Sequence, residues 1–174
     1  MRAVESRYSA EHHMASVNLI FDDEQTAYLR ELSEKMNLDF GEFIPHATLI
    51  NVTEQDIPRL KLAAAALPSL DKLVLDGVNF LPDEAGNCVC VELRVQKTSW
   101  MVEVRRKLLE MLDDIHPGLD IDGFRPHITL GIVEAGTLGD VDMSAIPRQL
   151  PVITKPRAAA CYNGMHGKVV EVVE

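Results

Sequence analysis

Two histidines in this sequence occupy the same heptad pattern, F-x-P-H-x-T-L. FIPHATL spans residues 43–49 and FRPHITL spans residues 124–130. The copies agree at five positions, which chance would produce about three times in ten million for any one pair of windows. Each copy places a histidine two residues before a threonine. The repeat therefore predicts two matched sets of one imidazole and one hydroxyl.

Two imidazoles and two hydroxyls suit the cleavage of a phosphodiester. An unperturbed imidazole titrates near pH 6.5, so one of His46 and His127 can be neutral and the other protonated at neutral pH. The hydroxyls of Thr48 and Thr129 can donate to the non-bridging oxygens of a phosphate. A lone histidine at the start of a strand is more often structural, but two copies in the same phase favour the catalytic interpretation. This chemistry needs no metal ion and no cofactor.

Strand geometry explains how each heptad can present these groups. Side chains alternate between the two faces of a strand, so His46 and Thr48 share one face while Ala47 and Leu49 take the other. The same holds for residues 127–130. Proline lacks a hydrogen for the strand ladder, so each histidine is expected at the beginning of its strand. If two lobes meet around a twofold axis, all four polar groups converge in one cleft.

The segments around the heptads repeat as well. Each half reads as a strand, a helix and then the heptad strand. The expected elements are a strand at 14–21, a helix at 23–36 capped by Asp22 or Asp23, a helix at about 54–67 after a Thr53/Asp56 capping box, strands at 70–80 and 88–95, a helix at 99–115, a loop at 134–149, and two short final strands around Asn163-Gly164. This order predicts an α+β fold that is bilobal and duplicated, with two antiparallel sheets and flanking helices around a central cleft.

Composition narrows the class of protein. The 174 residues are 47% hydrophobic and 25% charged, which is typical of a globular domain. We expect a flexible leader at 1–13 and a single bilobal domain at 14–174. No apolar run of about 20 residues or signal peptide is evident, so no membrane association is expected. Three cysteines without metal-ligand spacing indicate reduced thiols and a cytoplasmic protein.

Charge narrows the class of partner. The net charge of −10 argues against extended nucleic-acid binding, because gripping many phosphates requires a basic face. We therefore expect a small nucleotide or a short RNA end as the substrate. Arg125 could supply a local positive charge beside His127, and Tyr162 near the final turn could stack on a base or contact phosphate. The alternatives are a solvated rim position for Arg125 and a packing role for Tyr162.

The paired His-x-Thr motifs, His46-Ala47-Thr48-Leu49 and His127-Ile128-Thr129-Leu130, resemble those of the 2H phosphoesterase superfamily, which includes RNA 2′,3′-cyclic phosphodiesterases, also called 2′-5′ RNA ligases. The order of strands and helices is similar over roughly 14–174. The resemblance implies a bilobal fold, an acid–base pair of histidines, two threonines as phosphate ligands, and metal-independent action on 2′,3′-cyclic or 2′-5′ linkages. Bacterial members often carry an arginine shortly after the second motif, where this chain has Gly131 and Ile132.

Two other functions stay open at this point. The chain could be a non-catalytic nucleotide- or phosphate-binding module with a 2H-like cleft, or a 2′-5′ RNA ligase, which runs the same chemistry in reverse. The residues alone do not fix the preferred linkage or base, which histidine is the acid, or the oligomeric state.

Overall fold

The computed structural model describes residues 15–82, 85–115, 121–164 and 168–174. Its strands form two four-stranded sheets, ordered β2-β1-β7-β8 (the first sheet) and β5-β4-β3-β6 (the second sheet), and all neighbouring strands are antiparallel. The strands are β1 (Ala15–Ile20), β2 (His46–Val52), β3 (Lys72–Pro82), β4 (Cys88–Val95), β5 (His127–Glu134), β6 (Val152–Thr154), β7 (Arg157–Asn163) and β8 (Val169–Val173). The predicted α+β class with two antiparallel sheets is confirmed.

In the described part of the chain, three α-helices connect and cover these sheets: α2 (Asp23–Lys35), α3 (Ile57–Ala65) and α4 (Ser99–Met111). Helix α2 begins where predicted, because the Asp22 side chain accepts a hydrogen bond from the backbone N–H of Gln25. The predicted Thr53/Asp56 capping box is wrong. Asp56 itself caps α3, whereas the Thr53 hydroxyl donates to the carbonyl of Ile115 at 2.9 Å.

The remaining differences lie at the ends of elements. Helix α4 ends at Met111, four residues before the predicted end, and Leu112 caps it. The predicted loop at 134–149 contains two short 3₁₀ helices, Ala135–Asp140 and Met143–Ala145. Strand β6 was not predicted; it is only three residues long, too short to show a clear alternation of apolar side chains. The predicted leader at 1–13 lies outside the described residues.

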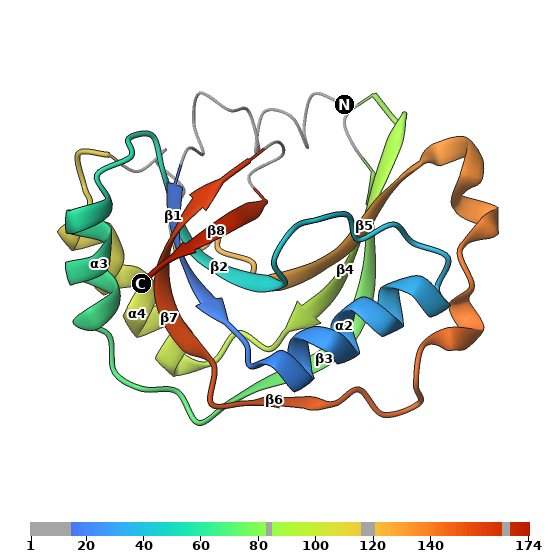
Figure 1. Ribbon diagram of the computed structural model, residues 1–174, viewed down its shortest axis with the longest axis horizontal. Coiled ribbons are helices and arrows are strands. Elements are labelled where there is room, and N and C mark those ends of the chain that lie inside the picture. Colours follow the sequence, from blue (N-terminus) through green and yellow to red (C-terminus); the bar gives the residue numbers. More distant parts are fainter. Residues whose placement is uncertain (1–14, 83–84, 116–120, 165–167) are drawn as a thin grey trace.

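The two repeated units, β1-α2-β2 and β4-α4-β5, exchange their helices. Helix α2 follows a strand of the first sheet but packs against β5, and α4 follows a strand of the second sheet but packs against β2. In Figure 1, α2 accordingly lies over the second sheet, and α4 lies with α3 beside the first sheet. The motif strands β2 and β5 are the edges of their sheets and contact each other at the centre of the molecule. One continuous core therefore joins both units.

Candidate active site

Both heptads show the alternation expected from the sequence. Ala47 and Leu49 are 0% exposed, as are Ile128 and Leu130, and all four belong to the main core. The histidines and threonines between them are half-buried. Each motif strand therefore has one face packed on the core and one polar face. The two strands contact each other, and His127 lies near enough to His46 to lower the pKa of its ring.

The leucine that ends each motif is the extra residue of a β-bulge. On β2, Thr48 pairs with Asn18 and Ile50 pairs with Val17, which leaves Leu49 without a partner. On β5, Thr129 pairs with Glu92 and Gly131 pairs with Val91, which leaves Leu130 without one. A bulge bends its strand and re-aims the neighbouring side chains. The two bulges therefore set the directions of the Thr48 and Thr129 side chains in the same way.

Each bulge is held by a buried side chain from the exchanged helix. The backbone carbonyl of a bulged residue loses its ladder partner and needs another donor when it is buried. The Leu130 carbonyl accepts from the Ser33 hydroxyl of α2 at 2.8 Å. The Leu49 carbonyl accepts from an Arg105 guanidinium N–H of α4 at 2.6 Å. The exchange of helices therefore supports both halves of the candidate site.

The two imidazoles are oriented by the same hydrogen bond. Nδ1 of His46 lies 2.7 Å from the carbonyl of Ile44, and Nδ1 of His127 lies 2.9 Å from the carbonyl of Arg125. A carbonyl can only accept, so Nδ1 carries the hydrogen in both rings. The proline between the two partners fixes the local backbone angle φ, which gives both bonds the same geometry. In both rings Nε2 is therefore the atom that can gain or lose a proton.

The environments of the two histidines differ in charge. Burial lowers the pKa of His46 to about 4, and the nearby His127 and Lys168 act in the same direction, against the hydrogen bond to Ile44. His46 is consequently neutral at pH 7. His127, in contrast, lies near a carboxylate: its Nε2 is 3.5 Å from Oε2 of Glu92. Glu92 is 0% exposed, and its other oxygen, Oε1, is 3.2 Å from the Arg125 guanidinium.

Lys168 is a second cation near the candidate site, besides Arg125. It precedes β8, and its ammonium lies 4.7 Å from the centre of the Phe43 ring, the first residue of the first heptad. Burial lowers its pKa, and Cys90 and Asp39 oppose that shift. Because it influences His46 and Cys90, it lies near the motif strand β2 and near β4, which pairs with the other motif strand. The sequence carried no signal for it, since the pairing of the last strand brings it there.

Of the two predicted substrate-binding residues, Arg125 lies near the histidines and Tyr162 does not. Arg125 lies beside His127 through its contact with Glu92. Tyr162 pairs with Ala15 on the core-packed face of the first sheet, opposite the face of Asn18 and Thr48, so the structure does not bring it to the histidines. A side chain at Gly131 would meet Leu38 Cβ at 3.1 Å. The segment after α2 therefore occupies the space that an arginine at this position would need.

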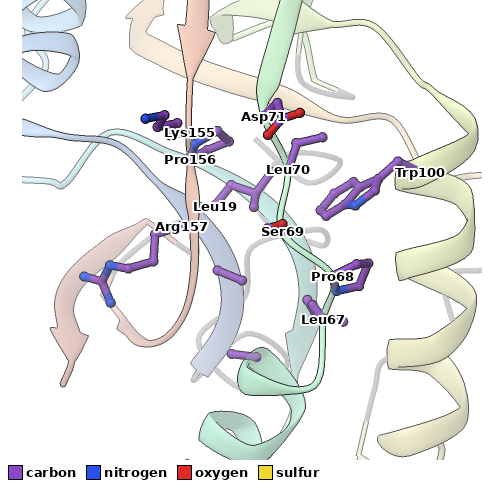
Figure 2. Close-up of a pocket in the computed structure, with 12 residues that line it drawn as sticks. Leu19, Leu67, Pro68, Ser69, Leu70, Asp71, Trp100, Lys155, Pro156 and Arg157 are labelled. Carbon is purple, nitrogen blue, oxygen red and sulfur yellow. The ribbon is translucent and has the colours of Figure 1, made fainter.

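A hollow of about 450 Å³ lies between residues of the first sheet, the segment after α3, and α4. Figure 2 shows Trp100 and Pro68 on one side, and Lys155, Pro156 and Arg157 on the other. No heptad residue lines it. Trp100 also packs against the main core.

Within the ranges given above, no three His, Cys, Asp or Glu side chains come together in a way that could hold a metal ion. None of the helices in the same part of the chain is long and apolar enough to span a membrane. The described cysteines Cys88, Cys90 and Cys161 form no disulfide bonds, as expected.

Comparison with known proteins finds a similarity in structure but none in sequence. No family model matches the chain, and no curated protein matches it in sequence. A solved structure described as a phosphoesterase matches with a TM-score of 0.52 at 13% identity, covering 94% of this chain and 97% of that one. Two structures of Usb1 from Kluyveromyces marxianus match more weakly: one with uridine monophosphate at a TM-score of 0.44 and 11% identity over 76% of each chain, and one at 0.45 and 12% over 78% of each. The chain thus shares its two-sheet α+β fold with that phosphoesterase structure.

Proposed function

We propose that the protein is a metal-independent phosphodiesterase that hydrolyses 2′,3′-cyclic or 2′-5′ phosphodiester bonds of small nucleotides or RNA ends. The observation that carries the proposal is the matched pair of imidazoles. Both fix their hydrogen on Nδ1 through a carbonyl two residues earlier, and both leave Nε2 for proton transfer. Two such histidines, on strands that contact each other, can act as the base and the acid when a phosphoryl group is transferred from one oxygen to another.

The described side chains can perform each part of this reaction. One histidine takes a proton from water, which attacks phosphorus in line with the leaving oxygen, and the other histidine protonates that oxygen. Thr48 and Thr129 hold the non-bridging oxygens as negative charge builds on them. Lys168 and Arg125 add positive charge near the motifs. These few cations, in a chain of net charge −10, favour a small substrate over a long nucleic acid.

A substrate panel tests the proposal. Nucleoside 2′,3′-cyclic phosphates, 2′-5′ dinucleotides and 3′-5′ dinucleotides are incubated with the protein in EDTA, and the products are read by mass spectrometry. We expect hydrolysis of one of the first two classes, a loss of at least about 10²-fold in His46→Ala and in His127→Ala, and a smaller loss in Thr48→Val and Thr129→Val. Thr137→Val is the control, because Thr137 is exposed and lies outside the motifs. Unchanged rates in both histidine variants would refute the assignment.

A binding module without turnover is the second candidate. It is favoured by the low pKa of His46, about 4, because so weak a base removes a proton from water poorly. Single-turnover assays over the same panel separate the two functions. Product that depends on both histidines excludes the binding module, whereas tight binding of the nucleotides without product supports it. Incubation of 2′,3′-cyclic ends with 5′-hydroxyl ends would reveal ligation as a longer product.

A further inference from the structure

The repeat extends beyond the heptads to the strands that pair with them. Asn18 on β1 is the residue directly opposite Thr48, and Glu92 on β4 is the residue directly opposite Thr129. Each follows a valine at the point where the bulge shifts the register, within Ser16-Val17-Asn18-Leu19 and Cys90-Val91-Glu92-Leu93. Both are 0% exposed. The two halves of the site are therefore matched down to this position, where one carries an amide and the other a carboxylate.

Both side chains have one buried oxygen that finds no hydrogen-bond partner among the described residues: Oδ1 of Asn18 and Oε2 of Glu92. The rest of each side chain is bound. Nδ2 of Asn18 donates to the Ser16 hydroxyl at 2.6 Å, and Oε1 of Glu92 contacts the Arg125 guanidinium at 3.2 Å. The open oxygen of Glu92, Oε2, lies 3.5 Å from Nε2 of His127.

A buried carboxylate needs compensation on both oxygens. Arg125 supplies it for one oxygen, and a protonated His127 would supply it for the other, since an opposite charge within about 4–6 Å favours the ionised form of both partners. In the first half, Asn18 is neutral and provides no such attraction for His46. The difference between an amide and a carboxylate thus makes two otherwise equivalent imidazoles unequal.

We propose that Glu92 is a positioning residue that keeps His127 protonated and directs its Nε2, and that this assigns His127 as the general acid and His46 as the general base. The inference rests on the proposed function. Nε2 of His46 takes a proton from water as the new P–O bond forms. The bond to the leaving oxygen breaks with its electron pair, and that oxygen takes the proton from Nε2 of His127. Exchange of protons with solvent restores both rings.

Other charged groups also face His127. On β4, Cys90 carries a thiol whose pKa burial raises to about 11, so it is neutral near pH 7. His46 on β2 lies near His127, and Lys168, which precedes β8, acts on the same ring of His46. Arg94, the ladder partner of His127, is paired with Asp76 of β3 at 2.6 Å. Glu92 places an anionic oxygen 3.5 Å from Nε2 of His127.

Glu92→Gln tests the inference, because it keeps the shape of the side chain and removes its charge. The pH–rate profile of the most active substrate is measured for the wild type, Glu92→Gln, Glu92→Asp and the exposed control Glu171→Gln. We expect the alkaline limb to move at least about one pH unit lower in Glu92→Gln, with the acidic limb unchanged. Glu92→Asp, which keeps the charge, should restore part of the shift. A role in packing alone would lower the melting temperature without moving the limb.

An NMR titration of the histidine side chains provides a readout that does not need activity. In the folded wild type, we expect the His127 ring to be protonated and the His46 ring neutral at pH 7, and Glu92→Gln to deprotonate His127 at lower pH. The reverse assignment in the wild type overturns the inference even if Glu92→Gln fails to fold. An unmoved alkaline limb, or an unmoved His127 signal in a folded Glu92→Gln variant, overturns it as well. Absence of turnover in the wild type with the expected titration would refute the enzymatic function and leave the role of Glu92 supported.

Discussion

Replacement of Ser33 by alanine tests how the exchanged helix holds the second bulge. Ser33 is 0% exposed, and its hydroxyl lies 2.8 Å from the Leu130 carbonyl and 3.3 Å from the Leu38 carbonyl. Removing the donor leaves the Leu130 carbonyl buried without a partner, which costs about 1–3 kcal/mol. Alanine is the better helix former, which returns about 0.5 kcal/mol. We therefore expect a net loss of about 1–2 kcal/mol.

Thermal unfolding followed by circular dichroism measures this loss. For a chain of this size, 1 kcal/mol shifts the melting temperature by about 2–4 °C, so Ser33→Ala should melt about 2–8 °C lower than the wild type. Ser99→Ala is the matched control, because Ser99 also lies in a helix but is exposed. If the two variants melt at the same temperature, the bond to the bulge contributes no net stability and the reasoning is refuted.

The remaining predictions concern the cations and the protons of the site. The pKa of His46 is lowered from 6.5 to about 4 in the folded protein. Between these two pH values the unfolded chain binds a proton on His46 that the folded protein does not. The free energy of unfolding should therefore fall as the pH drops from 6.5 to 4, by at most about 3 kcal/mol. Urea titrations at pH 7 and pH 4.5 measure this loss, and it should shrink in His46→Gln; an equal loss in both proteins would contradict the burial of a neutral ring. Lys168→Met keeps the stem on the Phe43 ring but removes the charge, so we expect KM to rise about 10-fold with a smaller change in kcat, compared with the exposed control Lys72→Met. A change in kcat alone would place Lys168 in the chemical step rather than in substrate binding.

Much of this architecture follows from local patterns that can be read in the sequence. The alternation of His46, Ala47, Thr48 and Leu49 predicts a strand with a packed face and a polar face, because the side-chain period of a strand is two residues. Asp22 ahead of an amphipathic stretch predicts the start of α2, because a side-chain oxygen there can cap the free backbone N–H groups. These features depend on neighbours in the chain.

The features that sequence reasoning missed depend on pairings between distant residues. Val17-Asn18 and Val91-Glu92 are visible as a weak repeat, but their position opposite the motif threonines follows only from the register of the strands. Ser33 and Arg105 read as ordinary helix residues until the exchange of helices brings them to the bulges. Thr53 was misread because its hydroxyl binds Ile115, far along the chain, rather than the helix that follows it.

The exchange of helices between the two units has a consequence for folding. A fragment that holds only β1, α2 and β2 would expose the face of α2 that packs on β5 and the face of β2 that packs on α4. Because such apolar surfaces cannot be buried within one unit, neither half is expected to reach a stable fold by itself. Two fragments made by cutting near the exposed turn at Gly86 should instead be unstructured apart and fold when mixed, as the subunits of an obligate dimer do.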